Sequence, residues 1–128
     1  MDTSPKPLIG IVGPCASGKS TLVKRLSIKG INARHIAQEH SYVPAMWEKI
    51  TQPAILIFLN VSYLQTIERS NLNWTTLEYQ EQLYRLRHAN EHAHLHIDTD
   101  NLSPELIEKL VITFLIQSGI IEADALNE

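Results

Sequence analysis

Eight consecutive residues near the start of the chain have the spacing of a phosphate-binding loop. They are Gly13-Pro14-Cys15-Ala16-Ser17-Gly18-Lys19-Ser20, which match the pattern G-x-x-x-x-G-K-[ST] at every fixed position. The two glycines let successive backbone N–H groups turn towards one anion, Lys19 can reach the β- and γ-phosphates of a nucleotide, and the Ser20 hydroxyl can bind Mg²⁺. We therefore predict that residues 13–20, with Thr21 after them, bind a nucleoside triphosphate and that Ser20 is a metal ligand.

The neighbouring residues predict the strand and the helix that such a loop requires. Residues 8–12 form a short apolar run, which is typical of a strand buried on both faces. Residues 19–29 predict a helix whose inner side carries Leu22, Val23 and Leu26. The N-terminus of this helix adds the positive end of its dipole to the predicted phosphate site.

Apolar runs alternate with helical patterns along the rest of the chain, as expected for a parallel sheet covered by helices. The further predicted strands lie at residues 32–37, 54–61 and 94–98, the second of them central. The further predicted helices lie at residues 44–50, 63–70, 76–92 and 104–119. The expected fold class is therefore α/β: a three-layer P-loop NTPase fold in which helices flank a short parallel sheet of about four strands.

Local signals mark where three of these helices begin. Pro44 suits the first position of a helix. Thr75 and Glu78 have the spacing of a capping box. Ser103 is a capping residue with Pro104 directly after it. The apolar face expected for the last helix consists of Leu106, Ile107, Leu110, Val111, Phe114 and Leu115.

Length and composition indicate one globular domain over residues 1–128, with a flexible N-terminal segment at 1–7 and a tail at 120–128. The formal net charge of −3 argues against nucleic acid or an anionic membrane as a partner. The single cysteine, Cys15, excludes an internal disulfide and is compatible with a reducing compartment. No apolar run reaches the roughly 18–20 residues of a membrane span, so we expect a cytoplasmic protein. The oligomeric state stays open.

Three stretches resemble the small P-loop kinases of nucleosides, nucleotides and metabolites, the adenylate-kinase-like and shikimate-kinase-like group. They are the 13–20 loop followed by Thr21, the run Leu56-Ile57-Phe58-Leu59-Asn60-Val61-Ser62, and Ile97-Asp98-Thr99-Asp100 with Ser103-Pro104-Glu105. The second run is similar to the strand before the mobile lid of those enzymes, and the third to their last strand and final helix. The resemblance implies ATP and Mg²⁺ as ligands, a helical lid at 63–92, contact of residues 98–102 with the adenine, and transfer of the γ-phosphate to a small molecule.

Other P-loop families fit less well. The chain lacks the Leu-Ser-Gly-Gly-Gln signature of an ABC-type ATPase and both the Asn-Lys-x-Asp and the Asp-x-x-Gly sequences of a GTPase. It also departs from the kinases, because residues 3–97 contain no aspartate and Asn60 stands near the end of the longest predicted strand. Glu39 is therefore the candidate base or Mg²⁺ partner, since it follows the second predicted strand on the side of the sheet where such proteins bind ligands. The alternative is a solvated loop glutamate.

The predicted lid contains three of the five arginines, which are Arg69, Arg85 and Arg87. Guanidinium groups neutralise the charge that a phosphoryl group carries during transfer. Arg69, at the end of the first lid helix, is the first candidate for this catalytic role. The alternative for each arginine is a surface ion pair with a helix glutamate. Trp74, in the turn between the lid helices, either stacks on a base or anchors the turn to the domain.

Four histidines, His88, His92, His94 and His96, have a spacing that could bring two pairs together around a metal. We interpret them instead as a polar helix end that runs into an edge strand. His35 and His40, on either side of Glu39, are better placed to contact a ligand.

Two function classes follow. The first is an ATP-dependent kinase with Lys19, Glu39 and Arg69 as catalytic residues and an unidentified small-molecule acceptor. The second is a nucleotide-binding sensor or regulatory module with little or no phosphotransfer. The missing aspartate favours the second class, and so does the short segment 38–52, which leaves room for one short helix where the kinases usually bind the acceptor.

Overall fold

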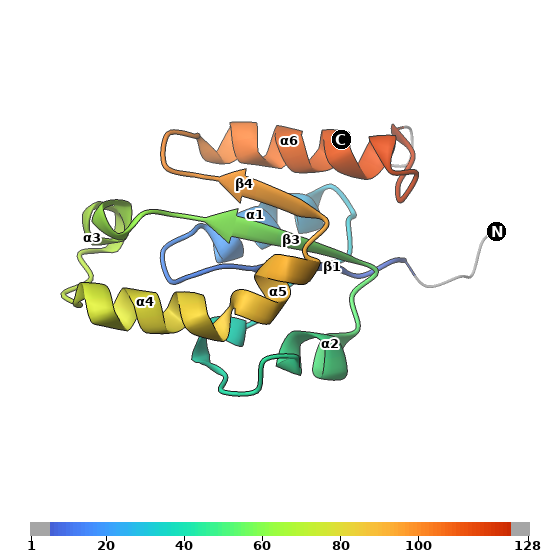
Figure 1. Ribbon diagram of the computed structural model, residues 1–128. Coiled ribbons are helices and arrows are strands. Elements are labelled where there is room, and N and C mark those ends of the chain that lie inside the picture. Colours follow the sequence, from blue (N-terminus) through green and yellow to red (C-terminus); the bar gives the residue numbers. More distant parts are fainter. Residues whose placement is uncertain (1–5, 124–128) are drawn as a thin grey trace.

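The computed structural model of the protein describes residues 6–123. Most of the predicted flexible segment at 1–7 and part of the predicted tail at 120–128 lie outside the described residues. Figure 1 shows a central sheet with helices above and below it. Within the described part of the chain, every helix is too short or too polar to cross a membrane.

The sheet consists of four strands, β1 (Ile9–Val12), β2 (Ala33–His35), β3 (Ile55–Asn60) and β4 (Leu95–Asp98), in the order β2-β1-β3-β4. Every neighbouring pair is parallel, so the carboxyl ends of all four strands meet at one edge. The predicted α/β class and the four-stranded parallel sheet are therefore confirmed. The inner strands are β1 and β3, as expected from their continuous apolar sequences.

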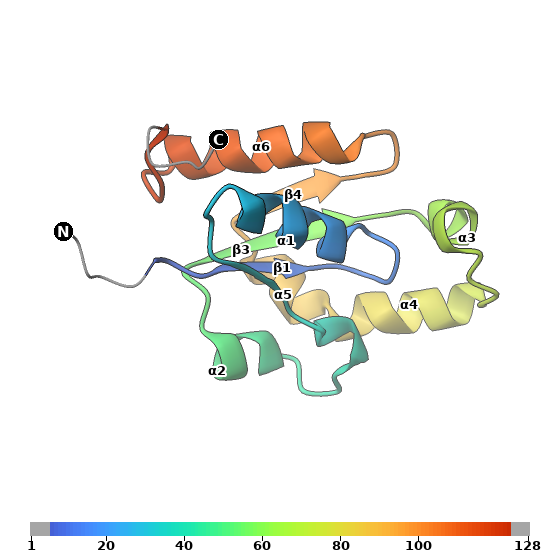
Figure 2. The same cartoon turned by 180° about the vertical axis from the view of Figure 1, so that it is seen from behind.

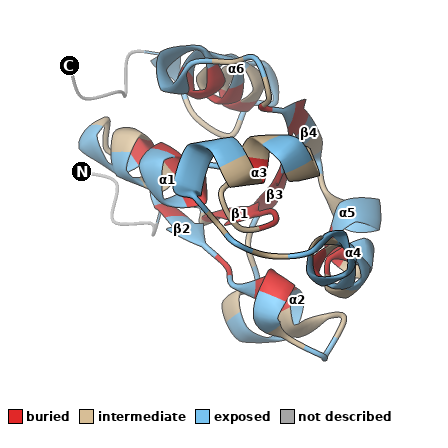
Figure 3. Ribbon diagram, turned by 90° about the vertical axis from the view of Figure 1, so that its left-hand side faces the viewer, coloured by how far each residue is buried: buried red, intermediate tan, exposed pale blue. Residues whose placement is uncertain are grey.

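The helical elements are α1 (Lys19–Ile28), the 3₁₀ turn η1 (Gln38–His40), α2 (Met46–Thr51), α3 (Tyr63–Ser70), α4 (Thr76–Arg85), α5 (Arg87–His92) and α6 (Pro104–Gln117). Helices α1 and α6 cover one face of the sheet, and α2 and α5 cover the other (Figures 1 and 2). Helix α3 lies beyond the carboxyl ends of the strands, which face the viewer in Figure 3. The protein therefore has three layers, and the loops that follow the strands lie at the carboxyl edge of the sheet.

The two faces of β3 explain why its sequence is apolar throughout. Ile55, Ile57 and Leu59 contribute to the core beneath α1 and α6. Leu56 and Phe58 point the other way and contribute to the core beneath α2 and α5. A parallel strand with helices on both faces must be apolar on both, and its alternate side chains fill two separate cores.

The predicted helix at 76–92 is wrong in one respect, because it is divided at Leu86 into α4 and α5. The fully buried side chain of Gln38 donates from Nε2 to the backbone carbonyl of Arg85 at 3.1 Å. In a continuous helix this carbonyl would accept the N–H of Ala89. The bond from Gln38 thus favours the break, after which Leu86 and Ala89 are both fully buried.

The same glutamine sets the beginning of α2. Gln38 Oε1 accepts the N–H of Trp47 at 2.9 Å, while Nε2 donates to the carbonyl of Val43 at 2.9 Å. The first turn of the helix therefore begins at Met46, two residues later than predicted, and the assignment of Pro44 to the first helical position is wrong.

The apolar face of α6 is narrower than predicted. Ile107, Val111 and Leu115 are buried, whereas Leu106 and Leu110 are 41% and 42% exposed. The helix lies over the edge of the sheet next to β4 (Figure 1), so the fully enclosed side chains form one stripe at a spacing of four, and Phe114 packs against the same core from a half-buried position.

The capping signals are confirmed. Thr75 and Glu78 form a capping box at the start of α4. The Ser103 hydroxyl oxygen accepts the N–H of Leu106 at 3.2 Å at the start of α6. The second strand, in contrast, covers residues 33–35 instead of 32–37, because the chain leaves the sheet to form η1.

Candidate functional site

Residues 13–20 connect the carboxyl end of β1 to the N-terminus of α1, as predicted. A Cβ atom on Gly13 would lie 2.3 Å from the carbonyl oxygen of Leu59 and 2.8 Å from Ser17 Oγ, so only glycine permits this close approach to β3. Gly18 has a left-handed backbone conformation (φ 99°) and precedes α1 without a side-chain cap. The first N–H groups of α1 therefore lack the side-chain partner that most helices supply at this end.

Lys19 is folded back against the loop that contains it. Its Nζ atom donates to the carbonyl oxygens of Gly13 at 2.7 Å and Pro14 at 3.0 Å, and lies 2.9 Å from Glu39 Oε2. An ammonium group has three N–H donors, and these three acceptors match them. The Lys19 and Glu39 side chains are only 9% and 5% exposed, so the ion pair is shielded from solvent.

Glu39 is brought to the loop by η1, which follows β2 at the carboxyl edge of the sheet. The alternative of a solvated loop glutamate is wrong, because the side chain is buried against Lys19. Its second oxygen, Oε1, is buried without a hydrogen-bond partner among the described residues. Buried polar atoms rarely lack a partner, so this oxygen is suited to an additional ligand.

Two adjoining cavities open beside the loop. The smaller one, of roughly 220 Å³, is formed by residues 16–21 and includes the exposed side chains of Ser20 and Thr21. The larger one, of roughly 310 Å³, is lined by Ala16, Ser17, Gly18, Thr21, Leu22, Arg69, Ser70, Leu102, Pro104 and Ile107. A small compartment with the hydroxyls of Ser20 and Thr21 thus continues into a larger one with several apolar walls.

Arg69 joins three segments at this place. Nη1 donates to the carbonyl of Ala16 at 3.1 Å and to Thr99 Oγ1 at 3.0 Å, and Nη2 donates to the carbonyl of Thr99. The guanidinium therefore connects the last turn of α3 to the 13–20 loop and to the segment after β4. Of the arginines predicted for the lid, this one is brought to the loop.

The other two arginines are placed elsewhere. The guanidinium of Arg85 lies 4.3 Å from the centre of the Tyr42 ring, and Nη1 donates to the carbonyl of Glu39 at 3.4 Å. Arg87, at the start of α5, lies 3.8 Å from the centre of the Tyr84 ring near the end of α4. Arg85 thus stabilises the backbone of η1, while Arg87 packs on the surface.

Trp74 anchors the turn between α3 and α4. Its indole N–H donates to Thr66 Oγ1 at 2.9 Å, and its backbone carbonyl accepts the hydroxyl of Tyr63 at 2.6 Å. The ring also packs edge-on against Tyr79. These contacts hold the turn to α3 and α4, within the segment 63–92.

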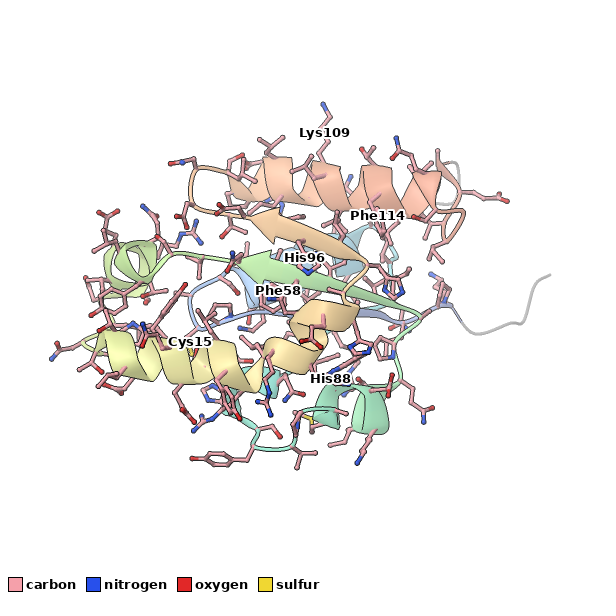
Figure 4. All side chains as sticks on the ribbon, in the orientation of Figure 1. Cys15, Phe58, His88, His96, Lys109 and Phe114 are labelled. Atoms are coloured by element: carbon pink, nitrogen blue, oxygen red, sulfur yellow. The ribbon has the colours of Figure 1, made fainter. Side chains whose placement is uncertain are left out.

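Gln82 is a contact of the loop that the sequence analysis missed. Its Oε1 accepts the backbone N–H of Cys15 at 2.9 Å, and its Nε2 donates to Cys15 Sγ at 3.0 Å. Cys15, in the 13–20 loop, accordingly lies against α4 (Figure 4). A signal was present, because Gln82 is a polar residue one helical turn from both the aromatic Tyr79 and the apolar Leu86.

The histidines of α5 and β4 have structural partners. Trp47 Nε1 donates to His88 Nδ1 at 3.1 Å, and the ring of His92 stacks on that of His88 with 4.1 Å between the centroids. His96, on the outer strand β4, lies beside Phe58 of the neighbouring strand β3 (Figure 4). These contacts support the interpretation as a helix end that runs into an edge strand.

Tyr79 is expected to affect the stability of the fold at high pH. Its hydroxyl donates to the carbonyl of Val61 at 2.6 Å, and burial, followed by the charges of Asp100 and Asp98, raises the pKa of Tyr79 above its usual value of 10.0. The folded state therefore holds this proton more tightly than the unfolded state, which adds stability below about pH 10 that is lost as the pH rises through the folded pKa. We expect Tyr79→Phe to cost about 1 kcal/mol at neutral pH and to flatten the alkaline decline.

Urea unfolding at neutral pH and above about pH 10 measures both effects of this substitution. Tyr84→Phe is the matched control, because Tyr84 is 60% exposed. An alkaline decline as steep in Tyr79→Phe as in the wild type would contradict the assignment to Tyr79.

The arrangement has four parts that lie together: an N-terminal helix end without a side-chain cap, a buried lysine, a buried glutamate beside it and an arginine that reaches over the loop. Positive groups predominate at the loop, so the site is suited to an anion. Comparison of the chain with models of known protein families gave no match, and neither did comparison with curated proteins.

Proposed function

We propose that the protein has a P-loop NTPase fold, binds ATP with Mg²⁺ and transfers the γ-phosphate to a small-molecule acceptor. The observation that carries this proposal is the buried ammonium of Lys19 beneath the 13–20 loop, held by two loop carbonyls and Glu39. An ammonium group next to uncapped helix N–H groups has the charge and the donors that a triphosphate requires.

The polar oxygens near the loop fit the metal that accompanies a triphosphate. The Ser20 hydroxyl opens onto the smaller cavity, and Ser17 Oγ is buried without a partner among the described residues. Ser20 would hold Mg²⁺, which would supply positive charge to offset that of the phosphates. Glu39 Oε1 is a further oxygen for a metal-bound water or for the hydroxyl of the acceptor.

The larger cavity fits the base of the nucleotide. It has apolar walls at Leu22, Leu102 and Ile107 and begins at the loop itself. Leu102 belongs to the segment 98–102 that the kinase resemblance assigns to adenine contact. The missing guanine sequence Asn-Lys-x-Asp favours adenine over guanine at this position.

In this proposal each side chain has one role in the transfer. Lys19 exchanges the carbonyls of Gly13 and Pro14 for phosphate oxygens and neutralises their charge. The departure of Lys19 frees Glu39 to orient the acceptor or a metal-bound water. Arg69 stabilises the charge on the transferring phosphoryl group, and the segment 63–92, anchored to the loop through Arg69 and Gln82, acts as the lid.

A nucleotide-binding sensor is the second candidate, and two observations favour it. Glu39, the buried acid next to the loop, is engaged by Lys19 at 2.9 Å. Asn60, at the end of β3 where many P-loop enzymes have an aspartate, carries no charge. A protein that only bound ATP would need no free acid at this edge of the sheet.

A turnover assay distinguishes the two candidates. Purified protein is incubated with ATP, Mg²⁺ and a panel of nucleosides, nucleotides and hydroxy acids, and ADP formation is measured. We expect ADP to form with at least one acceptor, and GTP to displace a labelled ATP analogue much less well than ATP does. If ATP binds but no acceptor leads to ADP formation, the sensor function is supported and the kinase function is contradicted. If no nucleotide binds, both candidate functions are contradicted.

A further inference from the structure

We propose that Cys15, Glu39 and His40 form a binding site for a thiophilic divalent metal of the zinc type. Cys15 Sγ lies 3.8 Å from His40 Nε2, and His40 Nε2 lies 3.8 Å from Glu39 Oε2. One ligand atom from each residue lies within 4.8 Å of the other two. The thiol comes from the 13–20 loop and the other two groups from η1, so the fold brings together residues that are 24 and 25 positions apart.

The donor types fit zinc, and so do the two separations of 3.8 Å that His40 Nε2 makes with Cys15 Sγ and Glu39 Oε2. Zinc–sulfur bonds of about 2.3 Å and zinc–nitrogen bonds of about 2.0–2.1 Å in a tetrahedron separate neighbouring ligand atoms by roughly 3.3–3.8 Å. Thiolate and imidazole select zinc or cobalt over Mg²⁺, which prefers oxygen ligands. The site is thus different in kind from the Mg²⁺ site proposed at Ser20. It uses the Glu39 that the proposed function assigns to the acceptor or to a metal-bound water, so it is a site of the nucleotide-free protein.

The surroundings of the three residues support a metal rather than an accidental cluster. Glu39 Oε2 lies 3.8 Å from His40 Nε2 and also holds Lys19, while the buried Oε1 of the same carboxylate has no hydrogen-bond partner among the described residues. Gln82 fixes Cys15 from the other side through its backbone N–H and its sulfur. Such hydrogen bonds orient metal ligands in known sites.

The exposure of the three residues to solvent and their charge are also compatible with the binding of a metal ion. The His40 side chain is 59% exposed and Cys15 is half-buried, so an ion can enter from solvent and a water molecule can complete the coordination. As the metal–sulfur bond forms, the Cys15 thiol gives its proton to solvent, and the thiolate and the Glu39 carboxylate together balance the charge of the metal.

Cobalt is the probe that tests the site, because its spectrum reports both sulfur ligation and geometry. Reduced, nucleotide-free protein is titrated with Co²⁺ under anaerobic conditions. We expect a thiolate-to-cobalt charge-transfer band and visible bands of tetrahedral intensity, which one equivalent of Zn²⁺ abolishes. Cys15→Ser should remove the charge-transfer band, and His40→Gln and Glu39→Gln should each weaken Co²⁺ binding by about 100-fold, at least as much as loss of a supporting hydrogen bond costs.

His35→Gln is the matched control, because His35 is an exposed histidine four residues before Glu39. It should bind Co²⁺ as the wild type does. Circular dichroism checks that each variant is folded. A wild type without a charge-transfer band would overturn the proposal. Equal Co²⁺ affinity in wild type, His40→Gln and Glu39→Gln would do so too, since the thiol would then act alone.

Discussion

Replacing Lys19 is expected to remove most of the stabilisation that ATP with Mg²⁺ gives to the fold. At an ATP concentration a hundredfold above Kd, the wild type should gain about 2.7 kcal/mol, or roughly 10 °C in melting temperature for a domain of this size. The gain depends on Lys19, because the ammonium beneath the loop is the charge that a triphosphate would meet.

Replacing Lys19 also affects Glu39, because the two side chains form an ion pair. Lys19→Ala alone leaves the Glu39 carboxylate buried without its partner, and breaking a buried pair in this way costs about 3–5 kcal/mol. The double variant Lys19→Ala/Glu39→Gln avoids this cost, and so separates nucleotide binding from the stability of the free protein.

Thermal melting with and without ATP·Mg²⁺ measures the response of the double variant. Glu39→Gln alone should keep most of the nucleotide-dependent shift. Lys24→Ala, an exposed lysine on the same helix, should keep all of it. A double variant that melts with the wild-type shift would show that the nucleotide site lies elsewhere.

The second large effect is expected for Arg69→Ala, which should lower the rate of phosphotransfer by about 10²–10³-fold, the loss typical of one charge-stabilising donor. The affinity for ATP should change only a few-fold, since the contact strengthens in the transition state. The side chain already reaches Ala16 of the loop. Single-turnover rates and equilibrium binding of ATP, measured separately, give the two quantities.

Controls are needed because Arg69 also holds Thr99. Arg87→Ala removes an arginine that packs on Tyr84 and should leave both quantities unchanged. Arg69→Lys keeps the charge and should recover part of the rate. If Arg69→Ala instead weakens ATP binding as much as turnover, the guanidinium serves the base cavity that it lines and not the transferring group.

The parts of the fold that depend on local signals could be predicted from the sequence. The apolar run at 8–12, the glycine-rich loop and the capping box at Thr75 are each specified by a few adjacent residues. The order of the strands in the sheet could be predicted only coarsely, because it depends on which distant segments of the chain pair with one another.

What the sequence did not reveal are bonds between residues far apart in the chain. Gln38 bonds both Trp47 and the carbonyl of Arg85, and so determines where α2 begins and where the helix at 76–92 is divided. Gln82 bonds Cys15, 67 positions away. From the sequence alone a glutamine is expected at the surface, because the segment that would bury it lies far away in the chain. The burial of Glu39 could not be predicted for the same reason.

The packing of α1 on α6 has a consequence for synthesis on the ribosome. The inner side of α1, with Leu22 and Leu26, shares one core with Ile107 and Val111 of α6, and Arg25 Nε lies 2.7 Å from Glu108 Oε1. At about 5–20 residues per second, these partners leave the peptidyl-transferase centre several seconds after the 13–20 loop. The core that α1 shares with α6 therefore cannot be completed until the end of α6 has been synthesised.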